Sequence, residues 1–427
     1  MLNVHQLHKY EAYKDSGADW LGMIPINWTS KKFKYLARVK KGKVPKRIVS
    51  ENRSGLPPYL SMEYLRGAEA NQFVEDRDAI VVSDGSILLL WDGSNAGEFV
   101  VGRGGVVSST LAAIDFFSVD RKFAWYACQV TEIELRSTTV GMGIPHVDGE
   151  QLKNSFLAIP SLDEQSLIAK FLDKKTTQID EAIAIKEQQI VLLKERKQII
   201  IQKAVTQGLD PTVPMKLSGV DWIGEIPKHW EVVRFKNLFS QSRLPVRIGD
   251  GVVTSYRDGQ VTLRTNRRLE GYTEAIIEGG YQGIRKGQLV LNSMDAFEGA
   301  IGVSDSDGKC TPEYVICDPN RGGISQYYFA YLLREMALGK YIQVICNAVR
   351  QRAVRIRYNN LAPRFMVVPP ESEQEEIVKF IESEKVKIGD GIDHLQSQIE
   401  KLKEYKTTLI NSAVTGKIKI TPDMVEA

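Results

Sequence analysis

Two long stripes of hydrophobic residues, spaced alternately three and four apart, are the clearest pattern in the chain. The first stripe consists of Leu172, Ile179, Ile183, Ile190, Leu193, Ile200 and Ala204, with Thr176, Lys186 and Lys197 as polar exceptions. The second consists of Ile381, Ile388, Ile392, Leu395, Ile399, Leu402, Leu409 and Ala413, with Lys385 and Lys406 as exceptions. Because Glu, Lys and Gln flank both stripes, each predicts a coiled-coil helix of about four heptads.

Each predicted helix begins after proline, at Pro160 and at Pro369 and Pro370, with acidic residues in the first turn, where the helix dipole favours them. At ~1.5 Å per residue, a helix over residues 165–207 is roughly 60 Å long. An apolar stripe of this length needs a partner, and the other stripe lies in the same chain. We therefore expect antiparallel pairing within the chain; pairing with another protein or with a second copy is the alternative.

Short apolar runs separated by turn residues precede each helix. Examples are AIVVSDGSILLLWDG at residues 79–93, VVSSTLAAI at 106–114, GQLVLNSM at 287–294 and EYVICD at 313–318. Gly and Asp punctuate these runs, which favours β-strands, while QYYFAYLLREMAL at 326–338 has the pattern of a short helix. The predicted fold class is α+β, with two β-rich domains separated by two long helices that form an antiparallel coiled coil.

The two halves of the chain repeat one another. SGADWLGMIPINWTSKKFKYL at residues 16–36 matches SGVDWIGEIPKHWEVVRFKNL at 218–238, an offset of 202 residues. IPSLDEQSLIAKFLD at 159–173 matches VPPESEQEEIVKFIE at 368–382, an offset of 209. The offset drifts because the ends of the unit are kept while its interior loops diverge. We predict a first domain over residues 1–158, a helix over 159–210, a second domain over 211–367 and a second helix over 368–427.

The tryptophan motif at the start of each copy is expected to pack the entering segment onto its domain. Its main residues are Trp20, Pro25 and Trp28 in the first copy and Trp222, Pro227 and Trp230 in the second. Paired aromatic residues around a Gly–Ile–Pro turn suit such packing. Direct contact with DNA or with another subunit is the alternative.

Composition narrows the class of protein. The net charge of +3 does not by itself indicate a polyanionic partner, and the four cysteines form no CxxC pair that would indicate zinc or a disulfide framework. No apolar run approaches the ~18 residues of a membrane span, and the polar N-terminus has no signal-peptide pattern. We expect a soluble, cytoplasmic protein that binds no metal and no membrane.

Motifs for catalysis are missing from the chain. LPPY at residues 56–59 is the string nearest to the [D/N]PP[Y/F] element of DNA adenine methyltransferases, but Leu56 has no acceptor for an amino group. GRGG at 102–105 lacks the pattern of an S-adenosylmethionine loop, and no GxxxxGK[ST] is present. Both short strings are predicted to be turns between strands, and the chain is predicted not to be an enzyme.

The repeated motif SGxDWxGxIPxxW, together with the EQ…I..F start of each heptad helix, resembles the DNA-specificity subunit of type I restriction–modification enzymes. The resemblance covers the whole chain and implies two target-recognition domains that read the halves of a gapped DNA site, with spacer helices that set the gap. It implies double-stranded DNA, two methylation subunits and, in systems that restrict, a restriction (translocase) subunit as partners. S-adenosylmethionine, ATP and Mg²⁺ are expected on those partner subunits, and no cofactor on this chain.

Candidate DNA contacts in the first domain lie in a basic segment. Residues 31–53 carry ten basic residues against one acid, Glu51. The candidates are Lys40, Lys41, Lys43, Lys46 and Arg47, with Arg103 beside three glycines as a further one. Basic loops supply phosphate contacts, which position a protein without specifying sequence. A solvated basic surface beside an edge strand is the alternative.

Two arginine clusters mark the second domain. The candidates are Arg264, Asn266, Arg267 and Arg268 in the first cluster and Arg350, Arg352, Arg355 and Arg357 in the second. Arg can bind guanine and Asn can bind adenine in bidentate fashion, so these clusters suit base readout as well as phosphate contact. The matching stretch of the first domain, VGMGIPHVDGEQL, has no arginine. This divergence fits two different half-sites, and it fits relaxed selection on a linker equally well.

Two other classes of function stay open at this point. A coiled-coil scaffold with two protein-binding heads would show no sequence-specific DNA affinity. A self-contained DNA-modifying enzyme would bind S-adenosylmethionine on the isolated chain. If the recognition hypothesis holds, the half-sites should lie about one helical turn (~34 Å) apart, and changing the length of both helices should change only the gap.

Overall fold

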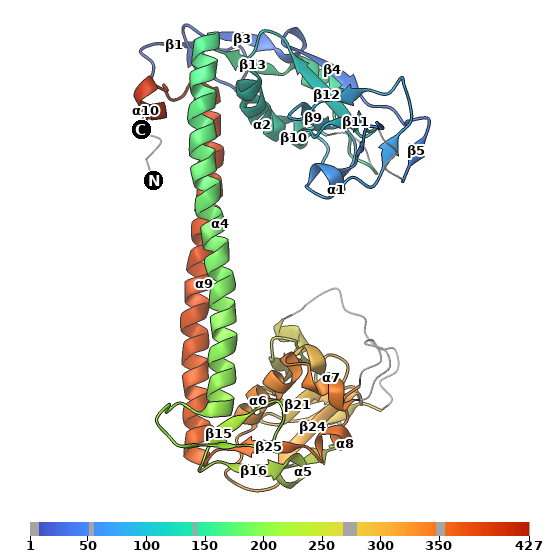
Figure 1. Ribbon diagram of the computed structural model, residues 1–427, viewed down its shortest axis with the longest axis vertical. Coiled ribbons are helices and arrows are strands. Elements are labelled where there is room, and N and C mark those ends of the chain that lie inside the picture. Colours follow the sequence, from blue (N-terminus) through green and yellow to red (C-terminus); the bar gives the residue numbers. More distant parts are fainter. Residues whose placement is uncertain (1–7, 51–54, 140–142, 268–279, 347–354, 427) are drawn as a thin grey trace. The chain divides into compact units, whose positions relative to one another are not determined.

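The computed structural model describes residues 8–50, 55–139, 143–267, 280–346 and 355–426. The chain forms two compact units (Figure 1). The first unit comprises Met1–Lys186 and Ser397–Ala427, and the second unit comprises Glu187–Gln396. Each of the two long helices, α4 (Leu162–Gln207) and α9 (Glu371–Val414), therefore contributes one part to each unit.

The described residues of the first unit form thirteen short strands. They are β1 (Tyr13–Asp15), β2 (Met23–Pro25), β3 (Thr29–Lys32), β4 (Ala37–Lys41), β5 (Ile48–Val49), β6 (Tyr59–Leu60), β7 (Phe73–Val74), β8 (Val81–Val82), β9 (Ile87–Leu90), β10 (Phe99–Val101), β11 (Gly105–Val107), β12 (Leu111–Phe116) and β13 (Phe156–Ile159). Its shorter helices are η2 (Phe33–Tyr35), α1 (Met62–Leu65), α2 (Arg121–Ser137), α3 (Gly149–Asn154) and α10 (Pro422–Glu426).

The second unit contains twelve strands in its described residues. They are β14 (Met215–Leu217), β15 (Glu225–Pro227), β16 (Glu231–Arg234), β17 (Phe239–Ser242), β18 (Val253–Ser255), β19 (Val261–Leu263), β20 (Gln282–Ile284), β21 (Leu289–Asn292), β22 (Ile301–Val303), β23 (Gly308–Cys310), β24 (Tyr314–Pro319) and β25 (Phe365–Val368). Its shorter helices are α5 (Phe235–Leu238), η3 (Arg264–Asn266), η4 (Ala296–Glu298), α6 (Gln326–Leu338), α7 (Tyr341–Ile345) and α8 (Tyr358–Leu361). The predicted helix at 326–338 is α6.

The two units are built on the same antiparallel sheet. Its strand order is β10-β9-β12-β4 in the first unit and β22-β21-β24-β17 in the second, so β4 and β17 are matching edge strands. The hairpin β1–β2 matches β14–β15, and the pair β3–β13 matches β16–β25. The sequence repeat is therefore a structural repeat, and the units differ in the smaller sheets inserted around this frame.

The central strand β9 is apolar throughout because it faces two cores. In β9, Ile87 and Leu89 join the large core of the first unit, while Leu88 and Leu90 join a smaller cluster on the opposite face. Successive side chains of a strand point to opposite faces, so a strand covered on both sides is continuously hydrophobic. In β21, Leu289 and Leu291 likewise join the large core of the second unit, while Val290 joins a smaller cluster.

The long helices pack as an antiparallel pair, as their heptads predict (Figure 1). In the first unit Leu172 and Ile179 of α4 share a core with Leu409 of α9. In the second unit Ala204 near the end of α4 shares a core with Ile381 near the start of α9. No helix among the described residues is long and apolar enough to cross a membrane.

Lysines at polar positions of the stripes bind across the helix pair. Nζ of Lys406 on α9 lies 2.7 Å from Asp180 on α4. Nζ of Lys186 on α4 donates to Oε1 of Gln398 at 2.5 Å. These contacts favour one register, because a slip of one heptad would separate both pairs.

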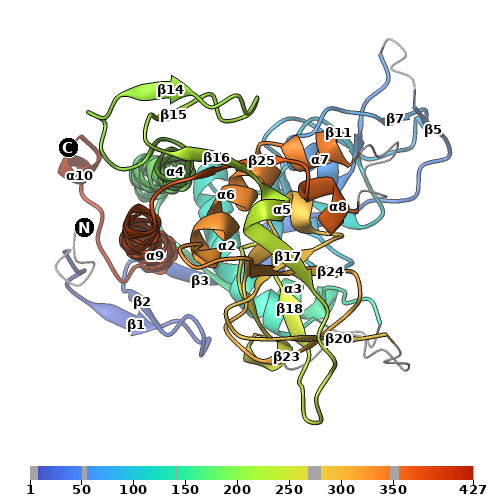
Figure 2. The ribbon, with the colours of Figure 1, turned by 90° about the horizontal axis from the view of Figure 1, so that it is seen from below.

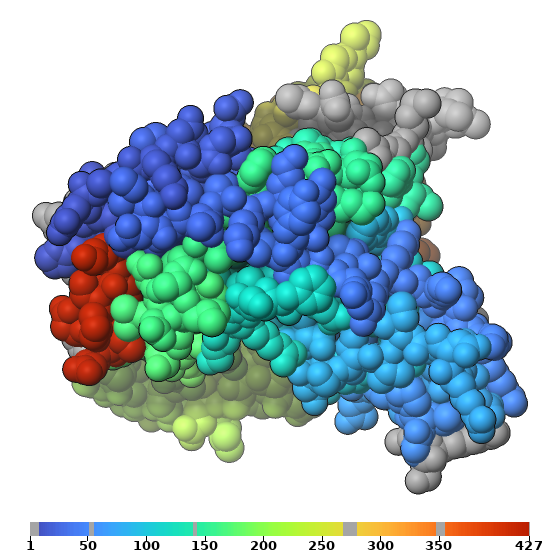
Figure 3. Space-filling view, turned by 90° about the horizontal axis from the view of Figure 1, so that it is seen from above, coloured from blue at the N-terminus to red at the C-terminus, as the bar shows by residue number. Residues whose placement is uncertain are grey.

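Each tryptophan motif packs against the end of the long helix from the other copy (Figure 2). The β1–β2 hairpin lies beside the end of α9, and Ile24 shares a core with Val414. The β14–β15 hairpin lies beside the end of α4, and Ile226 shares a core with Val205. Figure 3 shows the C-terminal segment of the chain next to its N-terminal segment, where the Lys419 backbone N–H donates to the carbonyl oxygen of His8 at 2.7 Å. The packing role predicted for this motif is confirmed by its buried tryptophans, which are 0% and 1% exposed at Trp28 and Trp230.

A buried glutamine in the first turn of each long helix ties that helix to its domain. Oε1 of Gln165 accepts from the backbone N–H of Asp120, the N-cap of α2, and Nε2 donates to the carbonyl oxygen of Pro160. Gln374 makes the same two bonds, to Ser325 at the N-cap of α6 and to Pro369. The glutamine of the EQ pair that begins each heptad helix thus ties the long helix to the N-terminus of α2 in the first unit and of α6 in the second.

Candidate nucleic-acid interface

The predicted cations of the first unit begin on the edge strand β4. Nζ of Lys40 lies 2.8 Å from Oδ2 of Asp115, and Nζ of Lys41 lies 2.9 Å from Oδ2 of Asp92. Both lysine side chains are about half exposed, at 45% and 44%. Exposed pairs of this kind contribute about 0–1 kcal/mol, so a phosphate group can compete with the carboxylates for either lysine.

The loop after β4 is tied down by acidic residues about thirty positions further along the chain. The backbone N–H of Lys46 donates to Oδ2 of Asp76 at 3.0 Å, and its Nζ lies 2.5 Å from Asp78. Nη1 of Arg47 lies 3.1 Å from Glu75. Backbone hydrogen bonds, that from Lys46 first, lower the pKa of Asp76. The predicted basic segment therefore forms a loop of defined shape, and its contact with DNA stays a prediction.

The half-buried side chain of Arg103 is held by contacts within its own unit. Its guanidinium stacks 4.1 Å from the ring centroid of Tyr64 and donates to the carbonyl oxygens of Tyr64 and Ala68, at 3.1 and 2.9 Å. These contacts fix the short helix α1 against the loop that precedes β11. A role in DNA binding would require the side chain to leave them.

The first arginine cluster of the second unit follows the β18–β19 hairpin. Nε of Arg264 donates to Oγ1 of Thr254 at 3.4 Å, and Nδ2 of Asn266 donates to Oγ1 of Thr262 at 2.8 Å. Arg267 pairs with Asp258 at 2.7 Å and stacks on the ring of Tyr256. Arg268 lies outside the described residues.

The second cluster borders a polar pocket of about 160 Å³. Arg357, at the N-cap of α8, lines this pocket with Asn359. Arg355 precedes it, with Nε 3.7 Å from Oε2 of Glu313, which also lines the pocket. Arg350 and Arg352 lie outside the described residues.

Two residues that the sequence did not single out complete this pocket. Gln241 and Arg243, on and directly after the edge strand β17, line it together with Arg357. No carboxylate among the described residues pairs with Arg243 or Arg357. We call this pocket the arginine pocket. It is lined both by Arg357, which the sequence analysis predicted as a DNA contact, and by Arg243, which it did not. The signal was available, because the offset of 202 residues places Arg243 opposite Lys41.

The strings that were compared with methyltransferase motifs form strands. Tyr59 begins β6 and Gly105 begins β11, and these two strands pair in parallel with Val106 opposite Tyr59. The prediction that LPPY and GRGG are turns is therefore wrong for their last residues, Tyr59 and Gly105, which lie in strands. A Cβ at Gly105 would lie 2.4 Å from the carbonyl oxygen of Pro58, so this glycine serves close strand packing.

The thiols of Cys310 and Cys317 are buried in the core of the second unit. Burial raises the pKa of the Cys310 thiol to about 12 and raises that of Cys317 as well, which keeps both thiols protonated and unreactive. Within the described ranges, no three His, Cys, Asp or Glu side chains are grouped to hold a metal ion.

Comparison with known proteins agrees with this architecture. Residues 25–195 match the family model of the type I restriction modification DNA specificity domain. The type I restriction enzyme MjaVIII specificity subunit of Methanocaldococcus jannaschii is 36% identical over 242 residues, which cover 56% of this chain and 54% of that relative. The alignment thus spans about half the length of this relative.

Solved structures share the fold over nearly the whole chain. A chain from a structure described as the "type I R-M system" aligns with a TM-score of 0.66 at 13% identity, over 92% of this chain and 98% of the other. The HsdS subunit of Thermoanaerobacter tengcongensis aligns with a TM-score of 0.51 at 15% identity over the same shares. The predicted resemblance is confirmed: residues 25–195 match the type I restriction modification DNA specificity domain, and the chain shares its fold with these solved structures.

Proposed function

We propose that this chain is the DNA-recognition subunit of a type I restriction–modification system. Each unit reads one half of a gapped double-stranded site, and the helices α4 and α9 set the gap. The chain docks two methylation subunits and, where the system restricts, a restriction subunit. Methylation of adenine at N6 with S-adenosylmethionine, and cleavage with ATP and Mg²⁺, belong to those partners.

One observation carries this proposal. The same four-stranded sheet occurs twice, and each copy places a cation-bearing loop directly after its edge strand, β4 or β17. The loops differ in sequence while the frame is kept, as expected of a protein that reads two different half-sites. The likeness to specificity subunits in domain and in fold supports the same conclusion.

Mapping of N6-methyladenine across the host genome, with and without this gene, tests the proposal. We expect methylation of one gapped motif to disappear with the gene and to return with the gene on a plasmid. If methylation is unchanged while the two methylation partners are expressed, the recognition role is overturned. DNA affinity that ignores sequence and vanishes at moderate salt would instead support a scaffold with two protein-binding heads.

A further inference from the structure

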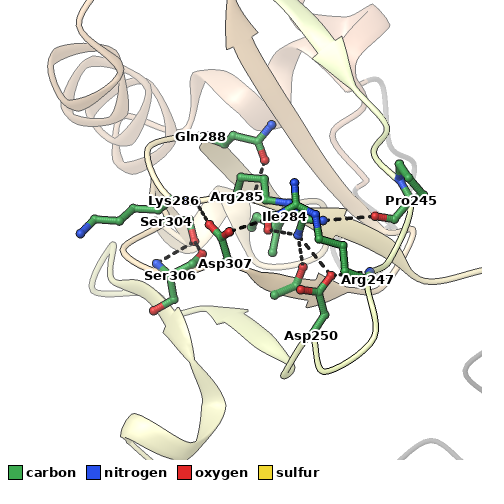
Figure 4. A network of polar contacts seen from close by, with 11 residues as sticks. Pro245, Arg247, Asp250, Ile284, Arg285, Lys286, Gln288, Ser304, Ser306 and Asp307 are labelled. Atoms are coloured by element: carbon green, nitrogen blue, oxygen red, sulfur yellow. Dashed lines mark hydrogen bonds and ion pairs between the residues drawn. The ribbon is translucent and has the colours of Figure 1, made fainter.

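The loop between β17 and β18 in the second unit is held by a buried ion pair (Figure 4). Nη1 of Arg285 lies 3.2 Å from Oδ2 of Asp250, and the two side chains are only 13% and 9% exposed. The same guanidinium donates to the carbonyl oxygens of Gly308 and Pro245, at 3.1 and 3.3 Å. Burying two charges carries a large desolvation penalty, which the bonds of the two Nη atoms offset in part, while the buried Nε of Arg285 has no hydrogen-bond partner. This loop therefore has a fixed shape at its base.

The turn of the loop is closed by the same carboxylate. The backbone N–H of Arg247 donates to Oδ2 of Asp250 at 2.8 Å, while Nη1 of Arg247 lies 3.5 Å from Asp307. Asp250 thus links Arg285 at the base to the turn above it. The loop extends away from the strands of its unit (Figure 2).

The side chain presented at the tip of this loop is apolar. Ile248 is fully exposed, at 109% of its reference area, and Val246 is 40% exposed. Arg243 at the base and Arg247 beside the tip are both exposed cations. A single exposed aliphatic residue needs no special explanation, but here Ile248 directly follows Arg247, and Val246 lies between Arg243 and Arg247 on the same loop.

The first unit has a similar loop after its own edge strand, in which the exposed aliphatic residue matches Val246 of the second unit. The loop after β4 exposes Val44, which is 77% exposed, between Lys43 and Lys46. Its turn is also closed by a carboxylate, since Oδ2 of Asp76 accepts from the backbone N–H of Lys46. The offset of 202 residues places Val44 opposite Val246. Two loops of different sequence thus share an exposed aliphatic residue, flanking cations and a carboxylate tie.

Cations beside an exposed aliphatic group match the surface of a DNA major groove. Phosphates line its edges, and the C5-methyl group of thymine is the apolar feature on its floor. We propose that Ile248 contacts a thymine methyl group in the half-site read by the second unit, with Arg243 and Arg247 on the neighbouring phosphates. This inference rests on the proposed function and adds a specificity-determining residue to it.

Replacement of thymine by deoxyuridine, which lacks only the methyl group, gives a direct test. The affinity of the full chain is measured on duplexes that carry the mapped target, with each thymine replaced in turn. We expect one replacement to weaken binding by the wild-type chain about fourfold, the effect of one buried methyl group. In Ile248→Ala that replacement should have no further effect, because the contact is already lost.

The control variant is Leu217→Ala, which removes an 81% exposed aliphatic side chain from β14 of the same unit. It should retain the full sensitivity to the methyl group. If Ile248→Ala keeps the same loss as the wild type, or if no thymine is sensitive, the inference is wrong while recognition of the target stands. If the wild-type chain does not distinguish its target from unrelated DNA, the proposed function itself fails.

Discussion

The indole N–H of Trp28 donates a 3.0 Å hydrogen bond to Oε2 of Glu164, in the first turn of α4. Trp230 makes the same 3.0 Å bond to Glu373, in the first turn of α9. Since each tryptophan motif also packs on the end of the other long helix, one motif connects the start of one helix to the end of its partner. The repeated motif thus holds the two long helices together at each end of the pair. We call this set of contacts the joint.

The joint of the first unit should be sensitive to loss of its carboxylate. Glu164→Ala leaves the indole N–H of Trp28 without a partner in a site where the side chain is 0% exposed. We expect a loss of about 1–3 kcal/mol in the free energy of unfolding, measured by urea titration. Glu181→Ala, an exposed carboxylate on the same helix, should change it by no more than about 0.5 kcal/mol. If both substitutions change the free energy of unfolding equally, the stabilising role of the Trp28–Glu164 bond is wrong.

Glu335 should make the stability of the second unit depend on pH. Its carboxylate accepts from Nε2 of Gln198 on α4, at 2.6 and 2.7 Å, and burial raises its pKa to about 7. The hydrogen bond from Gln198 and the charge of Arg334 oppose this shift only in part. Between the ordinary carboxyl range and pH 7, the folded state therefore holds a proton that the unfolded state has lost. Stability falls as pH rises through this window and is constant above it.

Comparison of the wild type with Glu335→Gln isolates this effect. The amide oxygen can still accept from Gln198, and the variant has no proton to lose. We expect the variant to be more stable than the wild type at pH 8 by on the order of 2–3 kcal/mol, and the difference to vanish near pH 4.5. Glu376→Gln, an exposed carboxylate on α9, is the matched control. A difference that does not vary with pH would contradict the assignment.

The arginine pocket should contribute phosphate contacts. Arg243→Ala and Arg357→Ala should each weaken binding of the full chain to target and non-target duplexes alike. The slope of log affinity against log salt should fall by about one for each phosphate contact removed. Lys387→Ala, which removes an exposed cation from α9 of the same unit, should leave the slope unchanged. Loss of discrimination at one base pair with an unchanged slope would show base readout instead.

The helix pair should determine the number of unread base pairs. Seven residues inserted after Lys186 and seven after Gln396 lengthen both helices at the boundary between the units, and a heptad keeps the apolar stripes in register. Each insertion adds about 10 Å, or roughly three base pairs of B-DNA. Methylome sequencing should then show the same half-sites with a wider gap. An unchanged gap would exclude the helices as the spacer, and insertion into one helix alone is the mispaired control.

Local patterns made much of the fold predictable. The heptads of α4 and α9 and the helix at 326–338 are visible in the sequence because one helix turn brings nearby positions onto one face. The repeat at offsets of 202 and 209 predicted two similar domains, and the matching sheets have the same strand order. The role of the tryptophan motif also followed, because large aromatic residues beside a tight turn are typical of a packed segment.

The environment of the candidate DNA contacts could not be predicted in this way. Arg103 stood beside glycines in the sequence, yet the fold places it on Tyr64 and on backbone carbonyls. The repeat offset could have pointed to Arg243, but its place beside Arg357 in the arginine pocket could not be predicted, because Arg357 is more than a hundred residues away in the chain. Charge and residue type set what a side chain can bind, while its neighbours decide whether it is free to bind.

The sequence by itself determined that the chain is a duplicated α+β protein with two heptad helices, one basic segment and two arginine clusters. These features depend on period, repetition and composition, which are properties of residues close together in the chain. The tertiary structure alone decided that Asp250 and Arg285 form a buried pair and that Ile248 stands exposed above it. Such pairing depends on strands that meet across long stretches of chain, and the burial of a charge is a property of the whole fold.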